Sequence, residues 1–539
     1  MIPEIEMRQP IHKFLAGIAV GVVIAVLLAV VSPPAASAAV VVDGAGSTWS
    51  QIAVDQWRAD VARQGITINY QGVGSTSGRV FWYNGQTDFA VSEIPFQAEG
   101  DGGINEIAKA QARGPYAYLP IVAGGTAFMY HLDVAGKRVT DIRMSPATIA
   151  KVFTGVIKTW NHPDIVAENK GRQLPAIPIK VVTRSDGSGT TAQFTAYMAS
   201  QTPNEWRKFC QVGGLGTDCR PTSIYPNPPG LGFVAQQFSD GVANFVAAPY
   251  NNGAITYVEY GYAKERGYPV LSVRNRGGYF VQPTAQAVAI ALQGARFNAD
   301  NTQNLEGVYT FADNRTYPVS SYSYGIVPTS ESGPFTKAEG DALGKFILYF
   351  LCAGQQKAEQ LGYSPLPKVL VQNGFDAVRK IPGAPAPPDI NTCQNPTITG
   401  DFITSAAPPP PPEDHDDGPT TATTVAGGGA TATTVPAGGA GTGTGDGTGA
   451  TDDGTGGGDV DGSDVTSDTI VDADGNVVAA DGSPVFAQPI AYASPVDYPA
   501  GDDPLPLAVF VAVGVAVAFV MFAPPALAFA LRRRRTGGS

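Results

Sequence analysis

Histidine is scarce in this sequence, and several patterns that accompany covalent catalysis are missing. The 539 residues include four histidines, of which His12 and His415 lie in terminal segments and His131 and His162 in the central region. Neither a G-x-S-x-G nucleophile elbow nor a glycine-rich loop ending in Gly-Lys-Ser/Thr is present. Because a hydrolase needs a base beside its nucleophile, the sequence predicts a protein that is not an enzyme, and a hydrolase is the least favoured alternative.

Lysine and arginine are absent from Asp401 to Asp503, a segment with eighteen acidic residues that is dominated by Gly, Thr, Ala, Asp and Pro. So few large apolar side chains cannot bury enough surface to offset the chain entropy, which predicts a disordered spacer over residues 401–505. The spacer carries most of the net charge of −12, and residues 43–400 carry only +2. That balance excludes a broad nucleic-acid-binding surface but allows a local anion site.

Apolar runs mark both ends of the chain. The run from Leu15 to Val31 follows two basic residues and precedes a small-residue cleavage pattern, which predicts a signal peptide over residues 1–38. An uncleaved anchor is the alternative. At the other end, residues 507–531 are uncharged and long enough to span a bilayer, and the arginines in the basic tail 532–539 mark the cytoplasmic side. We therefore expect a domain on the extracellular face of the plasma membrane, held by a single C-terminal helix.

The four cysteines fit an exported domain. An even number of cysteines in an exported chain predicts two disulfides. Cys210 and Cys219, nine residues apart, form the natural loop closure, which leaves Cys352 with Cys393; two other pairings are formally open. No two cysteines have the C-x₂-C or C-x₄-C spacing of zinc sites, so no metal is predicted.

The central region alternates between strand-like and helix-like segments. Apolar, β-rich runs occupy residues 66–72, 118–132, 177–184 and 254–260, and helical periodicity occupies residues 47–64, 145–156, 190–201 and 336–362. Such alternation predicts an α/β domain with largely parallel sheets, spanning residues 39–400.

Four loops have the chemistry of a ligand site at the carboxyl ends of strands. They are "DGAGSTWSQ" (43–51), "YQGVGSTSGR" (70–79), "DFAVSEIPF" (88–96) and "TRSDGSGTT" (183–191). Three are rich in Gly, Ser and Thr, which supply backbone and hydroxyl donors to an anion at a helix N-terminus. Each loop taken alone is also compatible with an ordinary turn or helix cap. Their recurrence favours an anion site.

Arg184 and Asp186 add charge to the last of these loops. The guanidinium of Arg184 offers a planar fork of N–H donors to an oxyanion, and Asp186 can hold that fork in position or accept a proton from the ligand. A surface ion pair within a turn is the alternative interpretation. We favour the site, because the pair lies in the same nine residues as a donor-rich loop.

The order of these motifs resembles that of the phosphate-binding proteins that serve high-affinity phosphate ABC transporters. The resemblance is carried by "GAGSTWSQIAVDQW", "INYQGVGSTSGRVFWYNGQTDFAVSEIPF", "SPATIAKVFTGVIKTWNHPDI", "VVTRSDGSGTTAQFTAYM" and "GAITYVEYGYAKERG", and it covers roughly residues 40–395. Its most specific part is R-x-D-G-S-G-T at residues 184–190, which is complete. The spacer and the C-terminal span lie outside it.

This resemblance implies an α/β, two-lobed, periplasmic-binding-protein-like fold with a hinge and an anion site between the lobes. One lobe would comprise residues 43–121 and 318–400, and the other residues 122–317. It further implies a monomer without cofactors that binds inorganic phosphate and delivers it to an ABC transporter permease. The phosphate ligands implied by position are Thr48, Trp49, Ser75, Glu93, Arg184, Asp186, Ser188, Gly189 and Thr190.

Two of these positions depart from the family pattern. Trp49 stands where phenylalanine is usual, in a contact made through the backbone N–H. Glu93 stands where aspartate is usual; in the family that carboxylate accepts a hydrogen bond from protonated phosphate and repels ionised sulfate. Glutamate keeps the charge but is one methylene longer. The alternatives are therefore another oxyanion, or a surface sensor, adhesion or structural module that retains the fold.

Overall fold

The computed structural model describes residues 40–100, 103–216, 219–300, 302–331 and 335–403, and the backbone of residues 469–471 and 477–479. The predicted signal peptide, most of the predicted spacer and the predicted membrane span at residues 507–531 lie outside the described residues. Among the residues that are described, no helix is both long and apolar enough to cross a membrane.

An eight-stranded mixed sheet connects two lobes, in the strand order β2-β1-β3-β15-β4-β10-β8-β9. The first lobe is built on β1 (Val41–Gly46), β2 (Thr67–Gly72) and β3 (Phe89–Ser92), and the second on β8 (Lys180–Arg184), β9 (Val234–Gln236) and β10 (Ala254–Glu259). Between them lie β4 (Tyr116–Tyr130) and β15 (Ser320–Pro328), which pair with each other and join the two sets.

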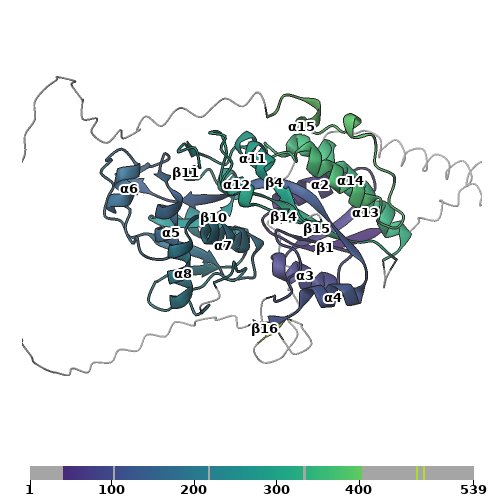
Figure 1. The fold of residues 1–539 in the computed structure, drawn as a ribbon, viewed down its shortest axis with the longest axis horizontal. Coiled ribbons are helices and arrows are strands. Elements are labelled where there is room, and N and C mark those ends of the chain that lie inside the picture. The colour runs from purple at the N-terminus through teal and green to yellow at the C-terminus, as the bar shows by residue number, and fades with distance from the viewer. Residues whose placement is uncertain are drawn as a thin grey trace, which may run out of the picture. The chain divides into compact units, whose positions relative to one another are not determined.

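Helices cover the sheet in both lobes (Figure 1). The first lobe carries α2 (Gln51–Ala62), α3 (Ser75–Tyr83), α4 (Glu106–Arg113), α13 (Lys337–Leu351) and α14 (Lys368–Val378). The second carries α5 (Pro146–Phe153), α6 (Pro163–Glu168), α7 (Gly189–Gln201), α8 (Pro203–Val212), α9 (Phe238–Ala247) and α10 (Tyr260–Glu265).

Shorter elements complete the described chain. The helices are α11 (Ala285–Ala291), α12 (Glu306–Tyr309), α15 (Pro396–Thr399), η2 (Leu292–Gly294), η3 (Ala353–Lys357) and η4 (Ile390–Thr392). The strands are β5 (Asp133–Val134), β6 (Lys137–Arg138), β7 (Arg143–Met144), β11 (Ser272–Arg274), β12 (Phe280–Val281), β13 (Arg296–Phe297) and β14 (Gln303–Asn304).

Local sequence explains where the site-forming elements begin. The hydroxyl of Ser188 accepts a hydrogen bond from the N–H of Thr191 at 3.2 Å, so the Gly-Ser pattern starts α7 as a capped helix. Ser145 caps α5 in the same way, and Pro146 follows at the first helical position, where its missing N–H costs nothing. The strand β10, "AITYVE", is buried along its whole length, as a central strand covered on both faces requires.

The sheet differs from the largely parallel one that the sequence predicts. β1 pairs in parallel with β2 and β3, and β8 pairs in parallel with β9 and β10. However, β15 runs antiparallel to both β3 and β4, and β10 runs antiparallel to β4. The antiparallel pairs lie where the chain passes between the lobes, because β4 leaves the first lobe and β15 returns to it.

Two further predictions can be compared with the structure. Both expected disulfides are confirmed, Cys210 with Cys219 and Cys352 with Cys393. Within the segment predicted as a spacer, β16 (Thr469–Val471) and β17 (Val477–Ala479) form an antiparallel pair that the sequence did not predict. Both strands are rich in β-branched residues, which favour this conformation.

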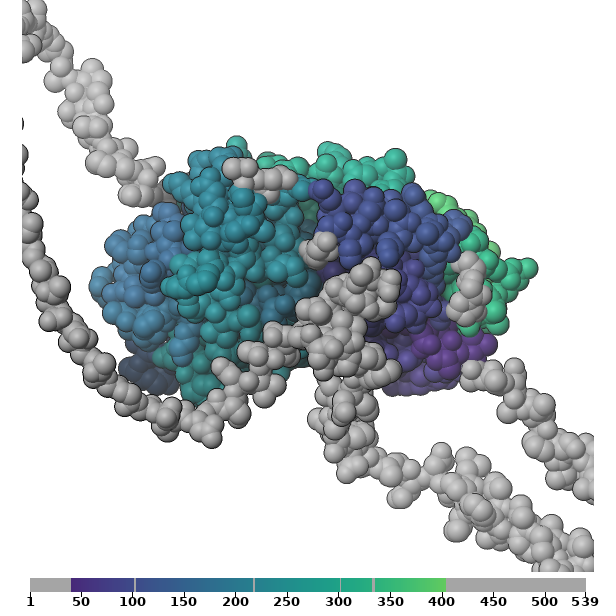
Figure 2. Space-filling model, turned by 90° about the horizontal axis from the view of Figure 1, so that it is seen from below, coloured from purple at the N-terminus to yellow at the C-terminus, as the bar shows by residue number. Residues whose placement is uncertain are grey.

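The two lobes meet through direct hydrogen bonds. The N–H of Thr76 at the start of α3 donates to the carbonyl of Gly187 at 3.2 Å, and the amide of Gln193 in α7 donates to the carbonyl of Glu93 at 2.7 Å. Figure 2 shows one face of this junction, where teal atoms of the second lobe lie beside indigo atoms of the first. The described conformation is therefore closed at the edge where the predicted ligand loops converge.

Candidate anion-binding site between the lobes

The loop from β1 to α2 places Ser47 at the centre of a hydrogen-bond network. Its hydroxyl oxygen accepts from the N–H of Trp49 at 3.0 Å and from the N–H of Ser50 at 3.4 Å. The same hydroxyl donates to Oε1 of Glu93 at 2.5 Å. Ser47 is fully buried, so its hydrogen bonds are shielded from water.

Glu93 lies at the end of β3, and both of its carboxylate oxygens accept hydroxyl protons. Ser75, the first residue of α3, donates to Oε2 at 2.7 Å, opposite the Ser47 contact at Oε1. Burial raises the pKa of Glu93 above its ordinary value, while the two hydroxyls and the charge of Arg184 act in the opposite direction. The carboxylate is 1% exposed and acts as a hydrogen-bond acceptor facing the second lobe.

Gly189 allows the Glu93 carboxylate to reach the N-terminus of α7. A Cβ added at residue 189 would lie 2.0 Å from Oε2 of Glu93 and 2.7 Å from the hydroxyl of Ser75. A side chain at residue 189 would displace the Glu93 carboxylate, so glycine allows the first lobe's acceptor and hydroxyl to approach the second lobe's helix end.

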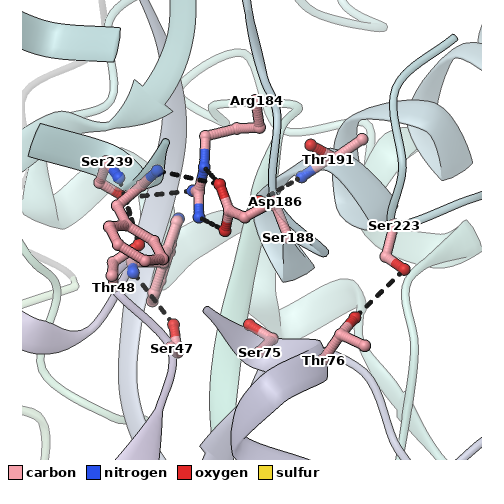
Figure 3. Close-up of polar contacts among 12 residues, drawn as sticks. Ser47, Thr48, Ser75, Thr76, Arg184, Asp186, Ser188, Thr191, Ser223 and Ser239 are labelled. Carbon is pink, nitrogen blue, oxygen red and sulfur yellow. Dashed lines mark hydrogen bonds and ion pairs between the residues drawn. The ribbon is translucent and has the colours of Figure 1, made fainter. Parts of the chain in front are cut away.

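Arg184, which is buried, forms an ion pair with the partly buried Asp186 at the end of β8. Nε of Arg184 donates to Oδ1 of Asp186 at 2.7 Å, and Nη2 donates to Oδ2. The third nitrogen, Nη1, donates to the hydroxyl of Ser239 at 3.3 Å. Figure 3 shows the guanidinium lying between Asp186 and the Ser239–Thr48 pair, which fixes its plane from two sides.

Thr48 joins the first lobe to the N-terminus of α9. Its hydroxyl lies 2.9 Å from the hydroxyl of Ser239 and accepts from the N–H of that residue at 3.2 Å. The N–H of Phe238, the first residue of α9, donates to Oδ1 of Asp186 at 2.9 Å. Phe238 has φ of +61°, an uncommon conformation for an aromatic residue, and this conformation places the helix end against the ion pair.

The remaining predicted residues lie in the same buried region. Ser188 donates its N–H to the carbonyl of Ser223 at 2.9 Å, and its hydroxyl caps α7. Thr190, in the first turn of α7, is 1% exposed. The indole of Trp49 packs edge-on against Tyr363 with ring centroids 5.7 Å apart. Only the backbone of residue 49 belongs to the polar network: its N–H donates to the Ser47 hydroxyl and its carbonyl accepts from Tyr363, while the expected contact of the N–H with a ligand stays a prediction.

The structure thus brings all nine predicted residues together and adds several that sequence reasoning missed. Ser47, Thr191, Gln193, Phe238 and Ser239 all make hydrogen bonds within this region. The α9 start could have been noticed, because "QFSDG" carries the serine, aspartate and glycine typical of a helix beginning after a strand. The role of Ser47 had no local signal, because it depends on Glu93.

The chemistry of this region suits a tetrahedral oxyanion that carries a proton. One guanidinium and the donor-rich N-termini of α7 and α9 favour negative charge, whereas the Glu93 carboxylate can accept a hydrogen bond from a protonated oxygen of the anion. Among the described residues, no group of three or more His, Cys, Asp or Glu side chains is arranged to hold a metal. A buried polar site between two α/β lobes, with chain crossings joining them, defines the class of two-lobed ligand-binding proteins.

Comparison with known proteins specifies this class further. The model of the PBP superfamily domain matches residues 33–353. The phosphate-binding protein PstS of Xylella fastidiosa (strain Temecula1 / ATCC 700964) is 31% identical over 347 residues, covering 63% of this chain and 86% of the relative. PstS of Pasteurella multocida (strain Pm70) is 31% identical over 337 residues, covering 61% and 88%. The chain belongs to the PBP superfamily and, within it, to the PstS family of phosphate-binding proteins.

A solved structure with a similar arrangement is that of PfluDING, described as a high-affinity periplasmic phosphate-binding protein bound with phosphate. It aligns with a TM-score of 0.48 at 20% identity, covering 62% of this chain and 92% of the other.

Proposed function

We propose that this chain binds inorganic phosphate outside the cell and delivers it to the permease of an ABC transporter, without covalent chemistry. The observation that carries this proposal is that one guanidinium and one carboxylate acceptor, from different lobes, are both buried at the closed junction between the lobes. Arg184 is 4% exposed and Glu93 is 1% exposed, and each comes from a different lobe. The PstS relatives are named for phosphate binding, which supports the same ligand.

The ligand set follows from the donors and acceptors in this region. Arg184, the hydroxyls of Thr48 and Ser75, and the first turn of α7 at Ser188, Gly189 and Thr190 donate to phosphate oxygens. The backbone N–H of Trp49, which donates to the Ser47 hydroxyl in the described structure, can share its hydrogen with a phosphate oxygen, and Asp186 holds the guanidinium plane through its two hydrogen bonds. Glu93 accepts a hydrogen bond from the protonated oxygen that phosphate carries near neutral pH and that sulfate lacks.

The proposal extends to the arrangement of the whole chain. Residues 43–121 and 318–400 form one lobe and residues 122–317 the other, and a hinge between them opens to admit the anion. A signal peptide at residues 1–38 exports the chain as a monomer, and the acidic spacer links the domain to a membrane helix at residues 507–531. Such a tether keeps the domain close to its permease and raises the effective concentration of the domain there.

Calorimetric titration of the full chain in mild detergent tests this function. Phosphate should bind at one site, and sulfate at the same concentration should release little heat. Glu93→Gln should weaken phosphate binding and admit sulfate, because an amide donates where the carboxylate only accepts. Absence of phosphate binding at millimolar concentration would end the transport proposal, whereas equal binding of sulfate by the unaltered chain would reassign the site to another oxyanion.

A further inference from the structure

The hydrogen bonds of Ser47 fix the direction in which its hydroxyl donates. A serine hydroxyl has one hydrogen to donate and an oxygen that accepts up to two. The oxygen of Ser47 already accepts from the N–H groups of Trp49 and Ser50, at 3.0 Å and 3.4 Å. Backbone N–H groups cannot reverse their direction. The one hydroxyl hydrogen is therefore directed to Oε1 of Glu93, at 2.5 Å.

This contact determines how the longer side chain of Glu93 is held. With Ser75 donating to Oε2 at 2.7 Å, each carboxylate oxygen receives one hydroxyl hydrogen. Each donor favours the ionised, accepting form of the carboxylate over a protonated form that would donate. A glutamate has one more rotatable bond than an aspartate, so two fixed donors also restrict where its acceptor oxygens lie.

The hydroxyls of Ser47 and Ser75 are the groups that hold the Glu93 carboxylate oxygens in place. The guanidinium of Arg184 from β8 is a charged neighbour, and the buried hydroxyl of Tyr70 from β2 also interacts with the Glu93 charge. Tyr70 donates to the carbonyl of Ser47 at 2.8 Å and so supports the same loop. α3 contributes the neutral Ser75, and α7 contributes Gly189 and the amide of Gln193, which donates to the Glu93 carbonyl.

We propose that Ser47 is a positioning residue for anion selection: its hydroxyl holds Glu93 as a fixed acceptor, and this favours a proton-bearing oxyanion over a fully ionised one. This inference rests on the proposed function, because it concerns the same site. Ser75 is also a proposed phosphate ligand, so its single hydrogen is shared between Glu93 and the anion. Ser47 has no such second partner and remains assigned to the carboxylate.

The test compares phosphate and sulfate binding to full-length variants in mild detergent. In Ser47→Ala, Glu93 loses one of two donors to its charged form, a contact typically equivalent to about 10- to 100-fold in an equilibrium constant. The phosphate-to-sulfate affinity ratio should fall by at least about tenfold, and the pH above which sulfate is excluded should rise. Ser47→Thr keeps the hydroxyl and should retain the wild-type ratio.

A matched control lies three residues along the same loop. Ser50 is equally buried, but its hydroxyl lies toward Tyr70 and makes no hydrogen bond to Glu93, so Ser50→Ala should leave the ratio unchanged. If Ser47→Ala weakens both anions equally, or leaves the ratio as it is, the positioning role is wrong. If Ser47→Ala does not fold, Ser47→Thr and Ser47→Val, which are alike in shape, test the same role by the difference between their affinity ratios. Failure of the wild-type chain to bind phosphate would instead refute the proposed function.

Discussion

Replacing Arg184 by alanine should separate phosphate binding from folding. The guanidinium makes two hydrogen bonds to Asp186 and one to Ser239, and its side chain is 3% exposed. Removing it leaves the Asp186 carboxylate, which is 11% exposed, with the N–H of Phe238 as a remaining donor at 2.9 Å. Breaking a buried pair in this way costs about 3–5 kcal/mol. Spread over roughly 360 ordered residues, this loss lowers Tm by about 4–7 °C.

The effect of Arg184→Ala on phosphate affinity can be measured separately from its effect on folding. Loss of a bidentate, charge-assisted donor should weaken phosphate affinity by at least about 100-fold, which corresponds to about 2.7 kcal/mol. Asp186→Asn combined with Arg184→Ala removes the unpaired charge, so the double variant should recover part of the Tm but none of the affinity. Thermal unfolding and calorimetry measure the two quantities separately.

Two outcomes would contradict this reasoning, one for the affinity and one for the stability. If Arg184→Ala is folded and binds phosphate within about threefold of the wild type, then the guanidinium does not contact the anion and the site lies elsewhere. If the double variant is less stable than Arg184→Ala, the buried carboxylate is not the source of the lost stability.

Three further predictions concern other contacts. Gly189→Ala should reduce phosphate affinity at least about tenfold in calorimetry, because its Cβ would lie 2.0 Å from Oε2 of Glu93; unchanged affinity would contradict the close approach of the lobes. Burial raises the pKa of Glu259 well above that of an ordinary glutamate, so folding is penalised increasingly as pH rises above about 4.3, where the unfolded chain ionises. Glu259→Gln should therefore gain Tm relative to the wild type between about pH 5 and pH 8 in thermal scans, and a constant difference would argue against a protonated Glu259. Cys352→Ala with Cys393→Ala opens a disulfide spanning 41 residues and should lower the free energy of unfolding by about 4 kcal/mol in denaturant titrations; a loss below about 1 kcal/mol would contradict this.

Much of the site could be predicted because its components are encoded locally. Arg184 and Asp186 lie two residues apart, and Ser188 caps the helix that follows them, so one short motif contains both the charge and the donors. The glycine-rich loop before α3 likewise contains Ser75 next to its helix start. Such patterns depend on backbone geometry within a few residues, which sequence reports directly.

The remaining features depend on contacts between residues far apart in the sequence or on the direction in which strands pair. Sequence periodicity predicts neither. Thr48 meets Ser239 across 191 residues of chain, and Ser47 meets Glu93 across 46. Neither serine is distinguished from an ordinary loop residue until its partner is known. In the same way, the apolar run at residues 118–132 predicts the strand β4 but not that it runs antiparallel to β15 and β10.

The same reasoning explains why Glu93 could not be interpreted from the sequence alone. Its extra methylene suggested a changed pocket, but the structure supplies two hydroxyl donors that hold its oxygens 2.5 Å from Ser47 and 2.7 Å from Ser75. The longer side chain thus retains defined hydrogen-bond partners at the edge of the second lobe. The proposed selectivity would depend on these partners as well as on the charge of Glu93.

A crystal structure of the full chain grown with phosphate tests the central claim most directly. We predict one phosphate enclosed between the lobes, with oxygens within hydrogen-bond distance of the Arg184 guanidinium and the α7 N-terminus, and one oxygen facing the Glu93 carboxylate. A phosphate bound outside this region, or oriented with no oxygen toward Arg184 and Glu93, would contradict it.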